Sequence, residues 1–516
     1  MKHPRKLFEI KILFAFALAS LLAGSLLQRY LGRGSSTPND DFYVYYFAAQ
    51  IVHDNPHANL YADVIKGDPL AEDAPIDSEI YTHAKSAGVG GVMVYLYPPL
   101  LADLFVPISR IPVFQAAALW RAFNLTLVLA SVLLLARMLR ISILSFEFVA
   151  LALAGYSFFP IHEAIWTGQA AIVMLALWMA GVAAYCDGCV VLSAAIFALA
   201  TAFKVTPILL LPLFFIWKDR RWIVSYLAAS TGLVAAMVAI NGWQTVRIYP
   251  SVMSAMSSGI PTSGNKALGS LVAWIYYGRI FTDESALAII ASEPHGLLIA
   301  AKAVSGAFYL LCLFLVWRSR PIERASRVVT IAVFGLITAC VSPVPWRHGY
   351  SVAFIALAIF WVKALRAPRP RILHAVLLTL TTFTLGVLFF DLAAAAPLPQ
   401  FCKIILVSLW ITATAWNSIP RWICWPFWDS TQPSAILLYW LDSTAAAAGC
   451  WLRSWSALSR RSQRWPSRRS RSGARPSRTC ATESSITTWI VLSISCIMVR
   501  DSQTQGCLEL TRNCRP

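Results

Sequence analysis

Charged side chains are scarce in this chain of 516 residues: only 13% are Asp, Glu, Lys or Arg, whereas 58% are hydrophobic. Soluble domains carry charge on about a quarter of their residues. The scarcity therefore excludes an ordinary soluble globular protein. Apolar stretches of roughly twenty residues recur along the sequence, and that length matches the hydrocarbon core of a bilayer. We predict an all-α, polytopic helical membrane protein.

Several sequence motifs that are typical of soluble enzymes are also missing. The chain has no Walker G-x-x-x-x-G-K motif, so it lacks the usual loop for nucleotide phosphates. Its eleven cysteines include only a single C-x-x-C, Cys186 to Cys189, in a short turn between apolar runs, and no zinc-like pairing of such motifs. We find no internal repeat of the kind that many transporters carry. A zinc site and a soluble nucleotide-sugar domain are therefore not expected.

The formal net charge of +18 does not require a nucleic-acid partner. Lys and Arg concentrate in loops between apolar runs, as the positive-inside rule describes. Thirteen further arginines, and no lysine, follow residue 419. We predict a transmembrane domain over residues 1–420. Residues 421–516 are an Arg/Ser/Trp/Cys-rich tail, either disordered and attracted to membrane lipid or translated out of frame, and we assign them no function.

Twelve apolar runs are candidate membrane spans. They cover residues 12–27, 113–136, 143–160, 169–186, 189–203, 205–217, 222–240, 297–317, 328–344, 349–366, 372–392 and 401–419. Basic clusters follow the runs that end at 136, 217, 317 and 366, and even numbers of runs separate them. All four clusters and the N-terminus therefore share the cytoplasmic side. The first loop, 28–112, falls outside, and its short apolar segment 98–110 is predicted to lie at the outer face.

The polar residues that could take part in catalysis or binding are predicted to lie on the outer face. Asp40 and Asp41 open the first loop directly after the first apolar run. Aspartates at the mouth of a membrane bundle are costly unless they are solvated or used. The same parity places these residues on that face: His162, Glu163, Trp166, Gly168, Gln169, Lys204, Asn265, Lys266, Arg347 and His348. We expect an outward-facing site.

Short motifs follow one another in a distinctive order over residues 1–420. They are Asp41-Phe-Tyr-Val-Tyr45-Tyr46, Leu60-Tyr61, Tyr97-Pro98-Pro99-Leu100, Gly168-Gln169, Lys204-Val-Thr-Pro207, Lys218-Asp-Arg-Arg-Trp222, Gly264-Asn265-Lys266-Ala267-Leu268 and Ser342-Pro343-Val-Pro-Trp346-Arg-His348. In this order they resemble the integral-membrane glycosyltransferases of family 87, part of the GT-C superfamily. Two departures stand out. Ala171 replaces the family's usual Asn, and Lys266-Ala267 replaces a common Gln-Ser.

The resemblance implies a GT-C fold in the cell (inner) membrane and a reaction at its outer, periplasmic face. A sugar, mannose or another hexose or pentose, would pass from a polyprenyl phosphate to an envelope glycolipid or glycan, with inversion at the anomeric carbon. An acidic residue of the first outer loop would be the general base. By motif position this is Asp41, with Asp40 as the second choice. Inversion needs one carboxylate to take the proton of the attacking hydroxyl.

The resemblance and the topology together give a set of candidate substrate-binding residues. They are Lys204, Arg347, His348, Gln169, Asn265, Tyr45 and Tyr97. No cofactor is expected, and because the first loop contains no Asp-x-Asp, we expect the reaction to be independent of a metal ion.

Each polar candidate also has a structural interpretation. Asp40 or Asp41 could cap an amphipathic surface helix that begins near residue 41. Lys204 could bind the donor phosphate or snorkel to the interface. Gln169 could bind sugar hydroxyls or join two helices. Arg347 and His348 could bind phosphate or acceptor, or anchor the membrane interface.

Two other functions would fit the same topology. A transporter or flippase of lipid-linked glycans would also be polytopic, although such proteins usually carry internal repeats and ionisable groups at mid-membrane. An envelope glycan polymerase or ligase would differ from a glycosyltransferase mainly in its acceptor.

The topology can be tested by cysteine labelling from outside the cell. With the 28–112 loop outside and the basic clusters inside, a cysteine probe at Asp73 should react with an impermeant maleimide. A probe at Arg324 should react only after the membrane is permeabilised. The opposite pattern would overturn the charge-based orientation.

Overall fold

The computed structural model describes residues 40–62, 74–255, 267–277, 295–319, 321–342 and 346–366. All the regular elements in these ranges are helices. The α-helices are α2 (Asp40–Asp54), α4 (Glu79–Ser86), α5 (Pro99–Phe105), α6 (Val113–Met138), α7 (Phe146–Ser157), α8 (Phe159–Thr167), α9 (Ala171–Cys186), α10 (Val190–Phe203), α11 (Leu211–Ile216), α12 (Arg220–Ala255), α13 (Leu268–Tyr277), α15 (His295–Ser319), α16 (Arg324–Val341) and α17 (Ala353–Arg366). Short 3₁₀ turns are η1 (Ile108–Arg110), η2 (Thr206–Leu210) and η3 (Arg347–Val352).

The described residues contain four helices that are long and apolar enough to cross a membrane. They are Val113–Met138, Arg220–Ser254, Gly296–Ser319 and Arg324–Val341. A fifth is added if α7 and α8, which meet at a 55° bend, form one broken span. The helical membrane class is thus confirmed for these residues. The count of twelve spans stays a prediction, since the runs at 12–27, 372–392 and 401–419, like the tail, lie outside the described residues.

Two helices depart from the predicted boundaries. The segment 161–168, expected to be an outer connection, is mostly the helix α8. Phe158 takes an extended conformation that separates α8 from α7, and Pro160 occupies the first turn of α8, where proline is tolerated. The run predicted at 222–240 continues to Ala255 as α12, but its helix is broken at Gly242 (φ 79°, ψ 157°), close to the predicted end.

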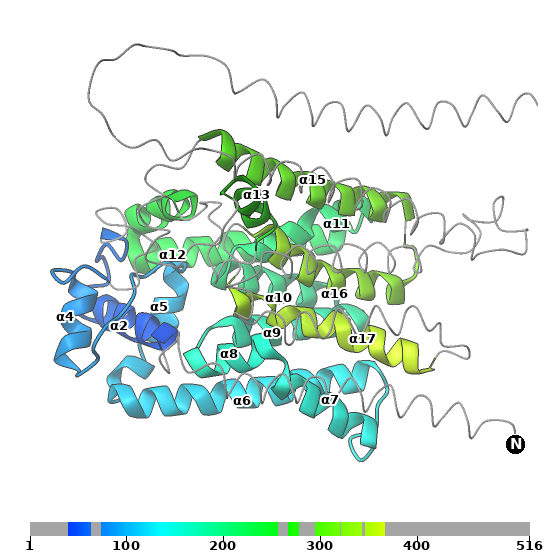
Figure 1. Cartoon of the computed structure of the whole chain (residues 1–516), viewed down its shortest axis with the longest axis horizontal. Helices are drawn as coiled ribbons and strands as arrows, with labels where there is room; N and C mark the ends of the chain where they lie inside the picture. Colours follow the sequence, from blue (N-terminus) through cyan, green and yellow to red (C-terminus); the bar gives the residue numbers. More distant parts are fainter. Residues whose placement is uncertain are drawn as a thin grey trace, which may run out of the picture. The chain divides into compact units, whose positions relative to one another are not determined.

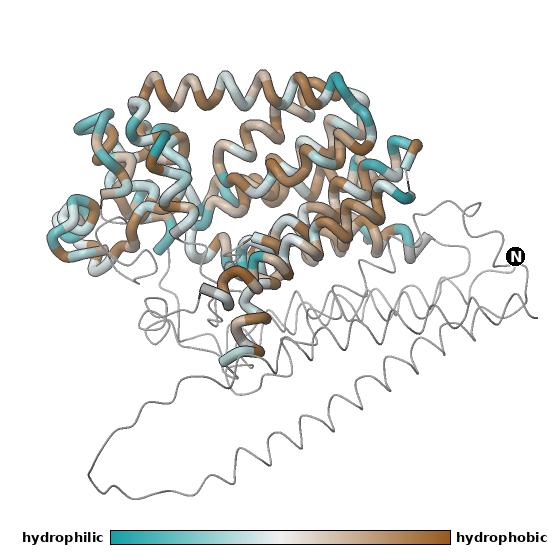
Figure 2. The backbone as a smooth tube through the Cα atoms, turned by 90° about the horizontal axis from the view of Figure 1, so that it is seen from above, coloured by the Kyte–Doolittle hydropathy of each residue, from teal (hydrophilic) through white to brown (hydrophobic). Residues whose placement is uncertain are grey.

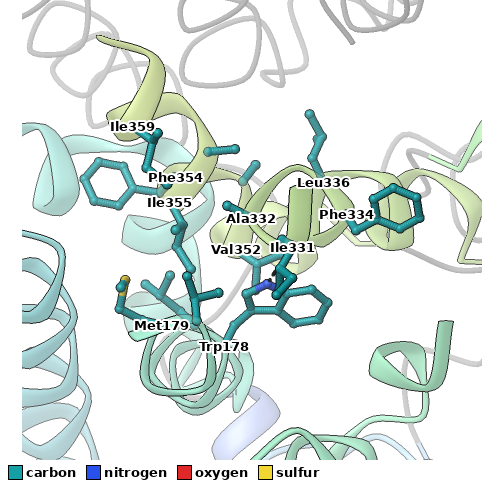
Figure 3. Close-up of a cluster of buried hydrophobic side chains, with 14 of the residues drawn as sticks. Trp178, Met179, Ile331, Ala332, Phe334, Leu336, Val352, Phe354, Ile355 and Ile359 are labelled. Carbon is teal, nitrogen blue, oxygen red and sulfur yellow. Dashed lines mark hydrogen bonds between the residues drawn. The ribbon is translucent and has the colours of Figure 1, made fainter. Parts of the chain in front are cut away.

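The apolar core joins helices that are distant in sequence. α9 packs against both α6 and α10, and α10 packs against α12. Figure 3 shows Trp178 and Met179 of α9 beside Ile331 of α16, with Phe354 and Ile355 of α17 next to them. The indole nitrogen of Trp178 donates to the carbonyl oxygen of Ile331 at 3.3 Å. This bond satisfies the polar atom of an otherwise apolar side chain inside the core.

A second, more aromatic core lies where α2, α4 and α5 gather at one end of α6, α9 and α10 (Figure 1). Figure 2 shows hydrophobic residues running along the long helices and hydrophilic residues concentrated near their ends. The prediction of an amphipathic surface helix near residue 41 is wrong in one respect. A helix forms there, but α2 is buried on nearly every side, including Phe42, Tyr45 and Phe47, because α4, α5, η1, α6 and α8 all pack on it.

Gly168 sets how closely α2 approaches the end of α8. It ends α8 in the left-handed region (φ +73°), and a Cβ there would lie 2.7 Å from the Cβ of Phe42. The carbonyl oxygen of Gly168 also accepts a 2.7 Å hydrogen bond from the indole of Trp120. The position therefore needs glycine for its backbone conformation and for the contact with α2.

Alanine at Gly168 should be markedly more destabilising than alanine at Gly88. Gly88 has a similar φ of +77° but open space around it. Gly88→Ala should therefore lower the free energy of unfolding by only about 1–2 kcal/mol, the cost of a left-handed conformation for a residue with a Cβ. Gly168→Ala adds a collision with α2 and should lower the Tm of the purified protein clearly further. Equal losses in the two variants would contradict a tight contact between Phe42 and Gly168.

Candidate active site

Asp41 is the centre of the candidate site. It lies in the first turn of α2 and is only 7% exposed. Its carboxylate accepts hydrogen bonds from the side chains of Thr167 and Gln169, at the junction of α8 and α9. The Thr167 hydroxyl can also donate to the backbone carbonyl of Glu163 at 3.2 Å, but an ionised carboxylate is the stronger acceptor. The carboxylate therefore links α2 to α8 through side chains.

The surroundings of Asp41 make it a weak acid. Burial raises its pKa from 3.8 to about 7. The hydrogen bond from Thr167 opposes this rise, the neighbouring charges of Asp40 and Glu163 add to it, and Gln169 again opposes it. A carboxylate with a pKa near neutrality can both accept and release a proton under physiological conditions.

Next to Asp41, the side chain of Gln169 joins Tyr45 and Tyr97 through hydrogen bonds. Its Oε1 accepts a 2.7 Å hydrogen bond from the hydroxyl of Tyr45, and its Nε2 donates to the hydroxyl of Tyr97 at 2.7 Å. The Tyr45 hydroxyl also accepts from the backbone N–H of Ala170 at 3.3 Å. Both ends of the amide are thus engaged by protein. Between the two interpretations of Gln169, this geometry favours the joining of helices, and Tyr45, which has no exposed surface, belongs to the same framework.

Lys204 lies near Asp41, and His348 lies near Lys204 and Arg347. Lys204 follows α10 in an extended conformation, and its Nζ would lie 3.7 Å from a Cβ at Gly349 in η3. Burial lowers the pKa of Lys204, and the charge of Asp41 opposes that shift. Burial also lowers the pKa of His348 well below its usual range, and the charges of Lys204 and Arg347 lower it further. His348 is therefore neutral at physiological pH.

Arg347 is fixed by an ion pair with Glu163. Its Nη2 lies 2.8 Å from Glu163 Oε1, and both side chains are largely buried, at 15% and 9% exposed. The guanidinium also lies over the ring of Phe159, 5.7 Å from its centroid. Because α8 and η3 pack together, this pair joins two elements about 180 residues apart in the sequence, and another polar bond, from Ser351 to the carbonyl of Ala171 at 3.1 Å, joins the same region. The guanidinium is consequently held in one place.

The structure brings most of the predicted site residues together. Asp41, Asp40, Gln169, Tyr45, Tyr97, Lys204, Arg347 and His348 form one neighbourhood. Asn265 lies outside the described residues. Their roles in catalysis and substrate binding stay predictions. Sequence reasoning missed Thr167, although its position directly before Gly168-Gln169 was a usable signal. Within the described ranges no group of three metal-ligating side chains occurs, and the expected independence from metal stays a prediction.

Apolar membrane helices that end around a buried carboxylate and nearby cations are consistent with an enzyme that acts on a membrane-bound, anionic substrate. Residues 95–343 match the model of glycosyltransferase family 87. This match confirms the resemblance seen in the motifs: residues 95–343 are similar to family 87, a family of membrane glycosyltransferases. The match favours a transferase over a transporter. A comparison with curated proteins found no match to this chain.

The stability of the protein should respond to pH through Asp41. Its pKa is higher in the folded state than its ordinary value of 3.8, so folding favours the neutral form. Its contribution to stability is complete below about pH 4 and is lost as the pH rises through about 7. Asp41→Asn is neutral throughout. The Tm of this variant minus that of the unmodified protein should therefore increase between about pH 4 and pH 8. A difference that does not change with pH would contradict the burial of an ionisable Asp41.

Proposed function

We propose that this glycosyltransferase moves a sugar from a polyprenyl phosphate to an envelope glycolipid or glycan at the outer face of the cell membrane, with inversion and with Asp41 as the general base. The observation that carries the proposal is the position of Asp41, buried in the first turn of α2 and close to Lys204, which in turn lies close to His348. The match of residues 95–343 to family 87 supports the class of reaction, and the donor, acceptor and stereochemistry belong to the proposal.

Asp41 would remove the proton from the acceptor hydroxyl as its oxygen attacks the anomeric carbon. A pKa of about 7 suits this role, because the carboxylate is ionised often enough to accept the proton and basic enough to hold it. Thr167 and Gln169 would keep the carboxylate oriented while it is ionised. In an inverting transfer one such base is enough, because the acceptor attacks from the face opposite the leaving group.

The bond that breaks joins the anomeric carbon to the phosphate oxygen, and its electrons leave with the polyprenyl phosphate. This leaving group gains negative charge and does not require a proton, so fixed cations are the main requirement. Lys204 and Arg347 would supply them. Glu163 would act through Arg347, because it holds the guanidinium at 2.8 Å and thereby orients it before the donor arrives. Neutral His348 would hydrogen-bond to the phosphate or to the acceptor.

Transfer of radiolabelled mannose from polyprenyl-phosphate mannose to endogenous envelope acceptors, in membranes that contain the protein, tests the proposal. Asp41→Asn keeps the size and helix-capping ability of the side chain but removes the basic oxygen, so kcat should fall by roughly 10²-fold or more. Asp40→Asn should cause a much smaller loss. Lys204→Ala should mainly raise the KM for the donor, because the base remains in place while phosphate binding weakens.

Protein level and Tm are measured for every variant, so that a loss of activity is separated from a loss of folding. A folded Asp41→Asn protein that transfers the sugar at an undiminished rate would exclude Asp41 as the base. Absence of transfer by the unmodified protein from polyprenyl-phosphate mannose, glucose and arabinose alike would exclude the proposed donor class.

A further inference from the structure

The turn between α8 and α9 carries two side chains that donate to Asp41. Thr167 is the last residue of α8, and Gln169 follows two residues later, with Gly168 between them. Because both donors must reach the same carboxylate, the backbone conformation of Gly168 decides whether their side chains can converge on it. The orientation of the candidate base therefore depends on how this turn is held.

Hydrogen bonds hold both polar atoms of the peptide group that joins Gly168 to Gln169. Its N–H, which belongs to Gln169, donates to the carbonyl oxygen of Ala164 at 2.8 Å. Its carbonyl oxygen, which belongs to Gly168, accepts from the indole Nε1 of Trp120 in α6 at 2.7 Å. A carbonyl at the end of a helix has no intrahelical partner and needs a donor from elsewhere. Trp120 supplies that donor, so the plane of this peptide is fixed.

The indole of Trp120 is itself held in place. Trp120 is only 5% exposed, and its ring lies 4.7 Å from that of Phe105 in α5 and 5.4 Å from that of Phe123. These neighbours restrict rotation of the ring. The N–H therefore keeps its direction toward the carbonyl oxygen of Gly168, and α6 becomes a rigid support for the turn.

A comparison with Trp178 separates this contact from ordinary packing. Trp178 is also buried, and its indole also donates to a backbone carbonyl oxygen, that of Ile331 at 3.3 Å. That bond lies within the apolar core, and neither of its partners adjoins in sequence a residue that bonds to Asp41. The bond of Trp120 instead ends on the residue between the two donors. Its loss would therefore be felt at the carboxylate.

We propose that Trp120 is a positioning residue for the candidate base, Asp41. Its indole N–H fixes the carbonyl oxygen of Gly168, and this holds the two flanking donors against the carboxylate. The inference rests on the proposed function, in which Asp41 removes the proton of the acceptor. Trp120 acts through the turn and not through contact with the substrate. Its contribution is preorganisation, because the carboxylate is oriented before the acceptor arrives.

Loss of the indole N–H should make Asp41 a weaker acid. The hydrogen bonds from Thr167 and Gln169 lower its pKa, because they stabilise the ionised carboxylate. When the turn loosens, these bonds weaken and the pKa of Asp41 rises further. The ionised base then forms only at a higher pH. The acid limb of the pH profile of kcat/KM, which reports the pKa of the base in the free enzyme, should therefore move to higher pH.

Trp120→Phe keeps an aromatic ring in place but removes the donor. In the sugar-transfer assay its acid limb should move upward by about half a pH unit or more, since one hydrogen bond to a charged group is worth about one to two pKa units. The KM for the donor, measured on the alkaline plateau, should not change.

A second variant separates the lost hydrogen bond from lost packing. Benzothienylalanine in place of Trp120 carries a sulfur atom where the indole has its N–H, and its ring has nearly the same shape. It should shift the acid limb as Trp120→Phe does. An acid limb that stays in place in both variants would overturn the proposal.

Trp178→Phe is the matched control. It removes an indole N–H that also bonds to a buried carbonyl oxygen, but in the apolar core. This variant should lower the Tm and leave the acid limb where it is. A shift equal to that of Trp120→Phe would overturn the proposal, because the effect would then follow from the loss of either buried bond.

Thermal unfolding measures the pKa of Asp41 without the reaction. The Tm of Asp41→Asn minus that of its parent protein should rise with pH up to the folded-state pKa of Asp41. With Trp120→Phe as the parent, this rise should extend to a higher pH and reach a larger value. With Trp178→Phe as the parent, it should not change.

The two measurements distinguish this inference from the proposed function. If the unmodified protein transfers no sugar but Trp120→Phe changes the Tm difference as expected, the positioning of Asp41 by Trp120 stands and the proposed reaction fails. If sugar is transferred and Trp120→Phe moves neither the acid limb nor the Tm difference, the reaction stands and the positioning role is overturned.

Discussion

Burial of the Asp41 carboxylate is the constraint on which the arrangement around it depends. A carboxylate removed from water must be hydrogen-bonded, paired or neutral. Here it receives two side-chain hydrogen bonds, and its pKa rises to about 7. Both donors, Thr167 and Gln169, flank Gly168, so the contact between α2 and α8 has to be close. The left-handed glycine permits that approach, and the Tyr45–Gln169–Tyr97 bonds keep it in register.

The charged side chains near Asp41 form two different arrangements: Glu163 with Arg347, and Lys204 with Asp41 itself. Glu163 and Arg347 form a largely buried ion pair, in which each charge partly compensates the other. Lys204 and Asp41 influence one another electrostatically without a direct ion pair among the described contacts. Arg347 compensates the charge of a new anion less fully than an unpaired cation does, because Glu163 already offsets part of its charge. A lysine whose burial penalty is only partly offset gains more when a phosphate arrives, so Lys204 has the greater capacity for charge compensation.

The sequence predicted the features that depend on local patterns. Long apolar runs gave α6, α9, α10 and α15 with ends close to those observed, and charge parity placed Lys204 and Arg347 on the same side as Asp41. Pairings between distant segments could not be predicted. Nothing local indicates that Asn241 bonds to Asp103, or that α2 is covered on nearly all sides, because both depend on which helices meet. The segment 161–168 was predicted to be an outer connection because it lies between two apolar runs, yet it is mostly the helix α8, in which Glu163 pairs with Arg347.

Two breaks interrupt the apolar helices, one before α8 and one within α12. Phe158 separates α7 from α8, whose far end holds Thr167, and Gly242 interrupts α12 directly after Asn241. In a membrane-spanning segment a break exposes backbone polar groups and is tolerated only where protein or a water-filled cavity satisfies them. At the first break, Phe158 and Phe159 are buried in the apolar core, and the ring of Phe158 lies 5.9 Å from that of Phe354 in α17. At the second break, Gly242 directly follows Asn241, whose amide donates to Asp103 Oδ2 at 2.7 Å, so here the interruption of the helix coincides with a polar contact to α5.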